Sequence, residues 1–268
     1  MEGSHPKRSG SLDLNDIPYE VRKFDFLSKD GIRLSAIEYV TNQPPKGTIL
    51  ACHYLGGSKT SIYTYIEPLL ARGFNVASFD YPNHGESDDR KGTRYSLEDD
   101  MRRFINKLKE LDIKGPYGTF GFSMGASIAL SATDYLPEIK AVVVDSGPLI
   151  YVRDYFLYVL SNKDVKNKIR RIVFLFIYLY IVGFYKMSRK MIRRLKTFDE
   201  LPVLIIHSKK DRIISFKNAE FVYSLLQSKN AELIPVEKAH HLTNRVILGN
   251  VYDQKVLEFF EKWLIENE

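Results

Sequence analysis

The sequence contains a single cysteine, so the chain cannot form an internal disulfide. This scarcity favours a reducing compartment, and we expect a cytoplasmic protein. The one thiol, Cys52, stands in an apolar run, which is typical of a buried core cysteine rather than of a nucleophile. The sequence therefore excludes a disulfide-stabilised scaffold and predicts no cysteine chemistry.

Apolar runs of membrane-spanning length are also absent. The longest, residues 172–185, falls short of the roughly 20 residues that a transmembrane helix needs. The first residues, MEGSHPKRSGS, lack the apolar core of a signal peptide, and we interpret residues 1–18 as a tail or the remnant of an expression tag. These absences predict a soluble protein.

Motifs for metals and nucleotides are missing too. No histidine or cysteine cluster has metal-ligand spacing, and the glycines form neither a dinucleotide-binding fingerprint nor a P-loop. We therefore expect no metal and no cofactor. The net charge of +6 is concentrated in residues 149–196, which hold twelve Lys or Arg and two Asp. Because no nucleic-acid-binding motif accompanies this charge, a nucleic-acid partner is not expected.

Strand-like and helix-like segments alternate from residue 19 to the C-terminus. The expected strands cover residues 21–28, 32–40, 48–55, 74–82, 117–123, 141–148, 202–209 and 232–238. The expected helices cover residues 58–73, 96–111, 124–136 and 251–266, the second opened by Ser96 with Asp99 in the capping-box position. The first two strands flank a turn and predict a hairpin. The remaining alternation predicts an α/β fold with a mostly parallel central sheet flanked by helices.

Residues 149–200 interrupt this alternation. They are basic and rich in aromatic residues, and one helical face carries Met187, Met191, Ile192 and Leu195. We interpret this segment as a helical cap, or lid, inserted between the two parts of an α/β core, residues 19–148 and 201–268. Its basic face has three interpretations that stay open here: a solvated surface, a guide for anionic substrates, or a peripheral membrane contact.

The stretch GFSMGAS places one serine, Ser123, between Gly121 and Gly125 at a predicted junction of strand and helix. A sharp turn there needs glycines, and it would expose the serine hydroxyl as a nucleophile. The backbone N–H of Met124, at the start of the helix, points to where an anionic oxygen would form. The alternative is that Ser123 is a small residue in an ordinary turn.

A serine nucleophile needs a base and an acid that orients the base. Asp211 follows a late apolar strand, and two histidines, His240 and His241, follow the next one. Because the carboxyl ends of parallel strands meet at one edge of a sheet, we expect these side chains to lie near Ser123.

At these motifs the chain resembles the α/β-hydrolase family over nearly all of residues 19–268. The matching pieces, in chain order, are HYLGGS, DYPNHGESD, GFSMGA, HSKKD and KAHH. The resemblance implies an α/β-hydrolase fold in which Ser123 is the nucleophile, Asp211 the acid and His241 the base. His240 is the alternative base. Asp145, at the end of an earlier strand, is the alternative acid, because some relatives place the acid there.

The resemblance also implies an oxyanion hole formed by the backbone N–H groups of Leu55 and Met124. Relatives commonly have His-Gly-x-Gly after the third strand, whereas here Tyr54 follows His53 in place of a glycine. Both His53 and Tyr54 are candidate substrate-binding residues. The alternative for Tyr54 is that its ring packs beneath the cap.

Three further polar residues are expected to be structural. Asp80 and His84 match a loop that lies near the site in relatives, and His207 lies within an apolar strand as a satisfied core histidine.

The function implied by this resemblance is that of a serine hydrolase, a carboxylesterase or lipase-like enzyme. Its substrate would be a small-molecule ester or lipid-like compound with an apolar acyl or aryl group, because the cap is rich in apolar and aromatic residues. An acyl thioesterase or acyltransferase would use the same triad. From another class, a non-catalytic binding protein on the hydrolase fold is the remaining alternative.

Overall fold

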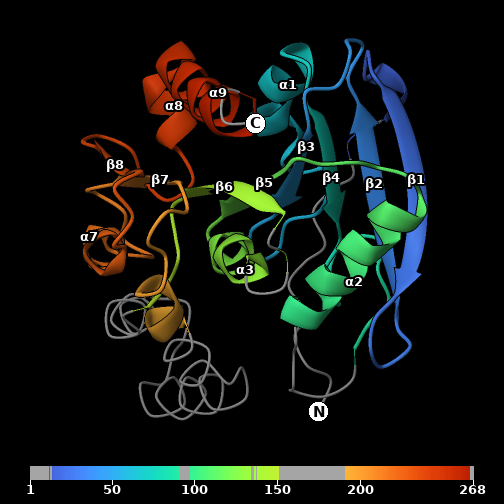
Figure 1. Ribbon diagram of the computed structural model, residues 1–268, viewed down its shortest axis with the longest axis horizontal. Helices are drawn as coiled ribbons and strands as arrows, with labels where there is room; N and C mark the ends of the chain where they lie inside the picture. Colours follow the sequence, from blue (N-terminus) through green and yellow to red (C-terminus); the bar gives the residue numbers. More distant parts are fainter. Residues whose placement is uncertain are drawn as a thin grey trace, which may run out of the picture.

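The computed structural model describes residues 12, 14–90, 97–133, 136, 138–150 and 191–265. Figure 1 shows a central sheet with helices on both of its faces. Eight strands form this sheet in the order β1-β2-β4-β3-β5-β6-β7-β8. The strands are β1 (Glu20–Leu27), β2 (Arg33–Val40), β3 (Thr48–Cys52), β4 (Asn75–Phe79), β5 (Tyr117–Phe122), β6 (Ile139–Asp145), β7 (Val203–Ser208) and β8 (Ala231–Val236).

Pairing within the sheet agrees with the predicted, mostly parallel architecture. β1 and β2 form the expected antiparallel hairpin, and β2 pairs antiparallel with β4. The pairings from β4 through β3, β5, β6 and β7 to β8 are all parallel. Every residue of β3, β5 and β7 is buried, as expected for central strands covered on both faces.

The helices divide into two layers. α1 (Tyr63–Ala71) and α9 (Asn250–Leu264) bury their apolar residues in one core cluster, on the face where Figure 1 also shows α8 (Asn244–Leu248). α2 (Leu97–Glu110), α3 (Met124–Ala132) and α7 (Phe216–Leu225) contribute to the cluster on the opposite face. A short 3-10 helix, η1, spans Leu14–Asp16.

The helix boundaries differ from the sequence-based predictions in places. α1 begins at Tyr63 rather than at Ser58, because Ser58 and Ser61 exchange side-chain and backbone hydrogen bonds in turns before it. It ends before Gly73, whose φ of 97° lies in the left-handed region. The expected N-cap of α2, Ser96, lies outside the described residues.

Among the described residues, two α-helices were not predicted. α8 has five residues, too short for a clear periodic pattern. α7 carried a usable signal, since Ser215 precedes it with extended backbone and Asn218, Ala219 and Val222 are buried at helical spacing.

Most of the predicted cap, residues 151–190, lies outside the described residues, and Met187 with it. Residues 191–195 are helical, and both Met191 and Leu195 are buried in the cluster shared with α2 and α3. At the other end of the chain, Leu14 and Ile17 pack against the core, although they fall within the predicted tail. Among the described helices, none combines the length and the apolar character needed to cross a membrane.

Candidate active site

The turn between β5 and α3 consists of Ser123 alone. Its φ of 52° and ψ of −110° are rare for a residue with a side chain. A Cβ added at Gly121 would overlap the backbone at Gly125, and one added at Gly125 would overlap the carbonyl oxygen of Cys52. Glycine at both positions therefore lets β5, α3 and the end of β3 approach one another closely, which holds Ser123 in its strained conformation.

Ser123, His241 and Asp211 form one hydrogen-bonded chain. Ser123 Oγ lies 2.9 Å from His241 Nε2, and His241 Nδ1 lies 2.7 Å from Asp211 Oδ2. Since an ionised carboxylate only accepts, Nδ1 carries the imidazole proton and Nε2 is free to accept the serine hydroxyl proton. Such an arrangement can activate a serine for attack on a carbonyl carbon.

The carboxylate of Asp211 is held in place by its own loop. Its side chain is fully buried, and Oδ1 accepts the backbone N–H groups of Ile213 and Ile214 at 2.8 and 2.9 Å. The other oxygen is thereby directed to His241. These bonds also satisfy a buried charge that would otherwise be costly.

The two alternative triad residues lie elsewhere in this geometry. His240 is exposed, and its backbone N–H donates to Thr243 Oγ1 at 2.7 Å. Asp145 is buried and accepts hydrogen bonds from the side chains of Ser146, Asn244 and Tyr252. The structure thus brings His241 to Ser123 and pairs it with Asp211.

The predicted oxyanion donors, Leu55 and Met124, follow the carboxyl ends of the adjacent parallel strands β3 and β5. The carbonyl oxygens of Cys52 and His53 lie against Gly125, so the loop after β3 passes beside the first turn of α3. Leu55 is 47% exposed at the surface of this loop. Both predicted donors therefore belong to the same end of the sheet as Ser123.

His53 does not have the environment of a substrate-binding residue. Its ring is fully buried, and Nδ1 donates to the carbonyl of Tyr54 at 2.8 Å while Nε2 accepts the backbone N–H of Tyr81 at 3.2 Å. Burial holds the pKa of His53 well below its usual value, which keeps the ring neutral. Because both ring nitrogens are already hydrogen-bonded to backbone groups, His53 links the loops after β3 and β4. This structural role differs from the predicted contact with a substrate.

Tyr54 is partly buried against the core. Its ring covers Gly57, where an added Cβ would lie 3.0 Å from Tyr54 Cε2. This contact gives Tyr54 a packing role within its own loop, while its contact with a substrate stays a prediction.

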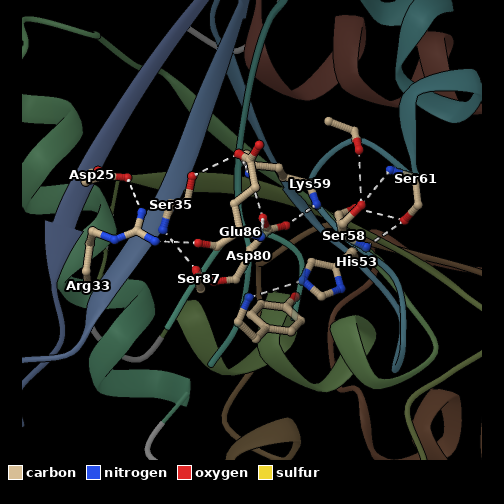
Figure 2. Close-up of polar contacts among 12 residues, drawn as sticks. Asp25, Arg33, Ser35, His53, Ser58, Lys59, Ser61, Asp80, Glu86 and Ser87 are labelled. Carbon is tan, nitrogen blue, oxygen red and sulfur yellow. Dashed lines mark hydrogen bonds and ion pairs between the residues drawn. The ribbon is translucent and has the colours of Figure 1, made fainter. Parts of the chain in front are cut away.

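A buried lysine that sequence reasoning missed anchors this loop. Figure 2 shows Lys59 between Asp80 and Glu86, with Nζ 2.6 Å from Asp80 Oδ2 and 2.7 Å from Glu86 Oε2. The backbone N–H of Lys59 donates to the other oxygen of Asp80 at 2.6 Å. Lys59 is 2% exposed and Asp80 is fully buried. Asp80 is structural, as expected, and its need for a buried cation is the signal that could have pointed to Lys59.

His84 also has structural contacts, as predicted, with Nδ1 2.9 Å from the carbonyl of Pro82 and its ring near that of His53. His207 agrees only in part with the prediction of a satisfied core residue. Its Nε2 donates to the carbonyl of Ile214 at 2.8 Å, but Nδ1 has no hydrogen-bond partner among the described residues. The Nε2 atom of His207 also lies 3.6 Å from Asp211 Oδ2. The His207 ring therefore packs against the carboxylate that bonds to His241.

Within the described ranges, no group of three or more His, Cys, Asp or Glu side chains is arranged to hold a metal ion.

A family model of the alpha/beta hydrolase fold matches residues 47–176. The chain is 25% identical over 252 residues to YfhR of Escherichia coli O157:H7, covering 90% of this chain and 81% of that uncharacterised protein. It is 26% identical over 251 residues to YqkD of Bacillus subtilis, also uncharacterised, covering 83% of this chain and 74% of that protein.

Solved structures share the architecture. The crystal structure of the Pyrococcus furiosus esterase Pf2001 superimposes with a TM-score of 0.79 at 21% identity, covering 98% of both chains. At this identity the likeness establishes the fold alone.

Proposed function

The chain has the α/β-hydrolase fold, and from this premise we propose that it is a serine hydrolase that cleaves carboxylic esters. The observation that carries the proposal is the hydrogen-bonded chain from Ser123 through His241 to Asp211, with distances of 2.9 and 2.7 Å. The strained backbone of Ser123 supports it further, since such conformations cluster at active sites.

In the proposed reaction Ser123 Oγ attacks the ester carbonyl while His241 Nε2 takes its proton. Asp211 keeps the imidazole in the required tautomer and stabilises its charged form. The backbone N–H groups of Leu55 and Met124 donate to the oxyanion of the tetrahedral intermediate. His241 then protonates the departing alcohol, and water releases the acyl group from Ser123 by the same steps in reverse.

The proposed substrate class is supported by the fold neighbours and by the composition of residues 149–200. The Pyrococcus furiosus protein of similar fold is described as an esterase, which supports an ester as the substrate. The apolar and aromatic residues of segment 149–200 favour an apolar acyl or aryl group, as in a carboxylesterase or a lipase-like enzyme. A cytoplasmic location and a peripheral membrane contact through the basic residues of this segment belong to the same proposal.

The test is hydrolysis of p-nitrophenyl esters from acetate to palmitate by the wild type, Ser123→Ala and Ser127→Ala. Ser127 is a matched control, because it is a buried serine in α3, the helix that follows Ser123. We expect Ser123→Ala to lower kcat by about 10⁴-fold or more and Ser127→Ala to leave it nearly unchanged.

Equal activity of Ser123→Ala and the wild type would show that Ser123 is not the nucleophile. A preference for acyl-CoA over the simple esters would favour the thioesterase alternative. An inert wild type that also fails to react with a fluorophosphonate probe would favour the non-catalytic binding protein.

A further inference from the structure

β6 lies in the sheet between β5, which leads to Ser123, and β7, which leads to Asp211. The backbone N–H of Ser123 donates to the carbonyl of Asp145 at 2.9 Å. The backbone N–H of the next residue, Ser146, donates to the carbonyl of Ile206 at 3.0 Å, on the strand that leads to Asp211. Asp145 and Ser146 thus contact both the nucleophile residue and the strand of the acid.

The side chain of Asp145 is fully buried and receives three hydrogen bonds. Its Oδ1 accepts from Ser146 Oγ at 2.6 Å and from Asn244 Nδ2 at 2.7 Å, and its Oδ2 accepts from Tyr252 OH at 2.6 Å. A set made only of donors fits an ionised carboxylate, which can only accept. These bonds offset the cost of burying the charge.

Two of these donors belong to the chain segment that follows His241. Asn244 begins α8, and Tyr252 lies in α9. The residue directly after His241, Leu242, is held at both of its peptide groups. Its N–H donates to Ser146 Oγ at 3.1 Å, and its carbonyl accepts from Tyr65 OH at 2.8 Å.

We propose that Asp145 is a positioning residue for His241, holding the segment after the base through Ser146, Asn244 and Tyr252 while its own carbonyl holds Ser123. One residue then fixes both ends of the contact between Ser123 Oγ and His241 Nε2. Asp211 orients the ring of His241, whereas Asp145 sets the position of its backbone. This inference rests on the proposed function for its catalytic meaning.

The physical need for such a residue follows from the backbone. Leu242 has a φ of 59°, so the segment after His241 is strained and requires bonds to keep it in place. Displacement of a catalytic group by about 1 Å can lower a rate by about 10²-fold. A buried carboxylate with three donors provides a rigid support, because each lost bond would leave a buried polar atom unpaired.

The test compares Tyr252→Phe and Ser146→Ala with Tyr117→Phe. Tyr117 is a matched control, because its buried hydroxyl donates to the carbonyl of Ile113 at 2.6 Å and it begins β5, at the other end of the strand from Ser123. We expect Tyr252→Phe and Ser146→Ala to lower kcat on p-nitrophenyl acetate by about 10- to 100-fold with KM within about twofold. Tyr117→Phe should lower Tm and leave kcat unchanged.

A second readout does not depend on activity. Long-range ¹H–¹⁵N spectra give the tautomer of the His241 imidazole. The signals of His241 are identified by their absence from the spectrum of His241→Gln. The wild type and Tyr117→Phe should hold the Nδ1–H tautomer, whereas Tyr252→Phe should show a mixture with Nε2–H. The proposal is overturned if Tyr252→Phe lowers Tm but leaves both kcat and the His241 tautomer as in the wild type. If the wild type hydrolyses no ester, the proposed function has failed, and the tautomer alone decides the positioning role.

Discussion

Three residues around the candidate site have positive φ without being glycine: Ser123 at 52°, Ser146 at 56° and Leu242 at 59°. Each such conformation costs about 1–3 kcal/mol and persists only where the surroundings fix it. Here the surroundings are the hydrogen bonds that join Ser123 N–H to Asp145 and Leu242 N–H to Ser146. The strain is therefore concentrated at the residues that hold the proposed nucleophile, Ser123, and the proposed base, His241, next to each other.

The two adjacent histidines allow a sharp test at the scale of the residue. His241→Gln should lower kcat by about 10⁴-fold or more, because it removes the imidazole nitrogen that lies within hydrogen-bond distance of Ser123 Oγ. His240→Gln should change kcat by less than about threefold, since His240 is exposed and bonds through its backbone. Both are measured as esterase activity of the purified variants. The reverse result would mean that the loop rearranges to bring His240 to Ser123.

At the scale of the element, α3 contacts the end of β3 at Gly125. Helix propensity and packing predict opposite effects of Gly125→Ala on stability. Alanine is favoured over glycine within a helix by about 1 kcal/mol, which predicts that Gly125→Ala is stabilising. The added Cβ would overlap the carbonyl oxygen of Cys52, which is backbone and cannot turn aside. Overpacking of this kind costs about 1–3 kcal/mol or more, so we expect packing to decide.

The corresponding measurement is the free energy of unfolding in urea for Gly125→Ala and for Gly31→Ala. Gly31 is the control, because its φ of 79° is unfavourable for alanine while no atom lies within 4 Å of an added Cβ. Its substitution should cost about 1–2 kcal/mol through backbone strain alone. Gly125→Ala should be less stable than the wild type and should also lose esterase activity, since the loop carrying Leu55 would move. A Gly125→Ala protein more stable than the wild type would contradict the contact.

At the scale of the whole molecule, two buried histidines couple stability to pH. Burial lowers the pKa of both His53 and His207 below their usual value of 6.5. Near and below pH 6.5 the unfolded chain therefore binds protons that the folded chain does not. The contribution of these histidines to the free energy of unfolding is fully present above that pH and decreases as the pH falls below it. For each histidine that stays neutral in the folded state, the free energy of unfolding decreases by about 1.4 kcal/mol for every pH unit below that value.

The prediction is measured with urea unfolding of the wild type and His53→Asn at about pH 7.5 and pH 5.5. Between these values the wild type should lose about 1.4 kcal/mol more than the variant, because only the wild type contains the buried imidazole of His53. Comparison of the two proteins cancels the opposite contribution of buried carboxylates with raised pKa, such as Glu38 and Asp145. An identical pH dependence in both proteins would mean that His53 titrates alike when folded and unfolded.

The amino-acid sequence alone was sufficient for the features that depend on neighbouring residues. The apolar runs and turn residues predicted the hairpin, the parallel strands and most of the helices, because the periods of strands and helices are local properties. The glycines around Ser123 likewise predicted the junction of β5 and α3. The positions of Asp211 and His241 after strand ends were enough to place them at one edge of a parallel sheet.

Only the tertiary structure decided the partnerships between distant residues. It determined that His241 rather than His240 lies at Ser123, that Lys59 pairs with Asp80, and that Asp145 bonds to Tyr252 across 107 positions of sequence. Hydrogen bonds of this kind depend on angles and distances of a few tenths of an ångström, which follow from how whole strands and helices pack. Local sequence patterns do not contain that packing, so the candidate site residues could be predicted from the sequence, while the hydrogen bonds that hold them in place could not.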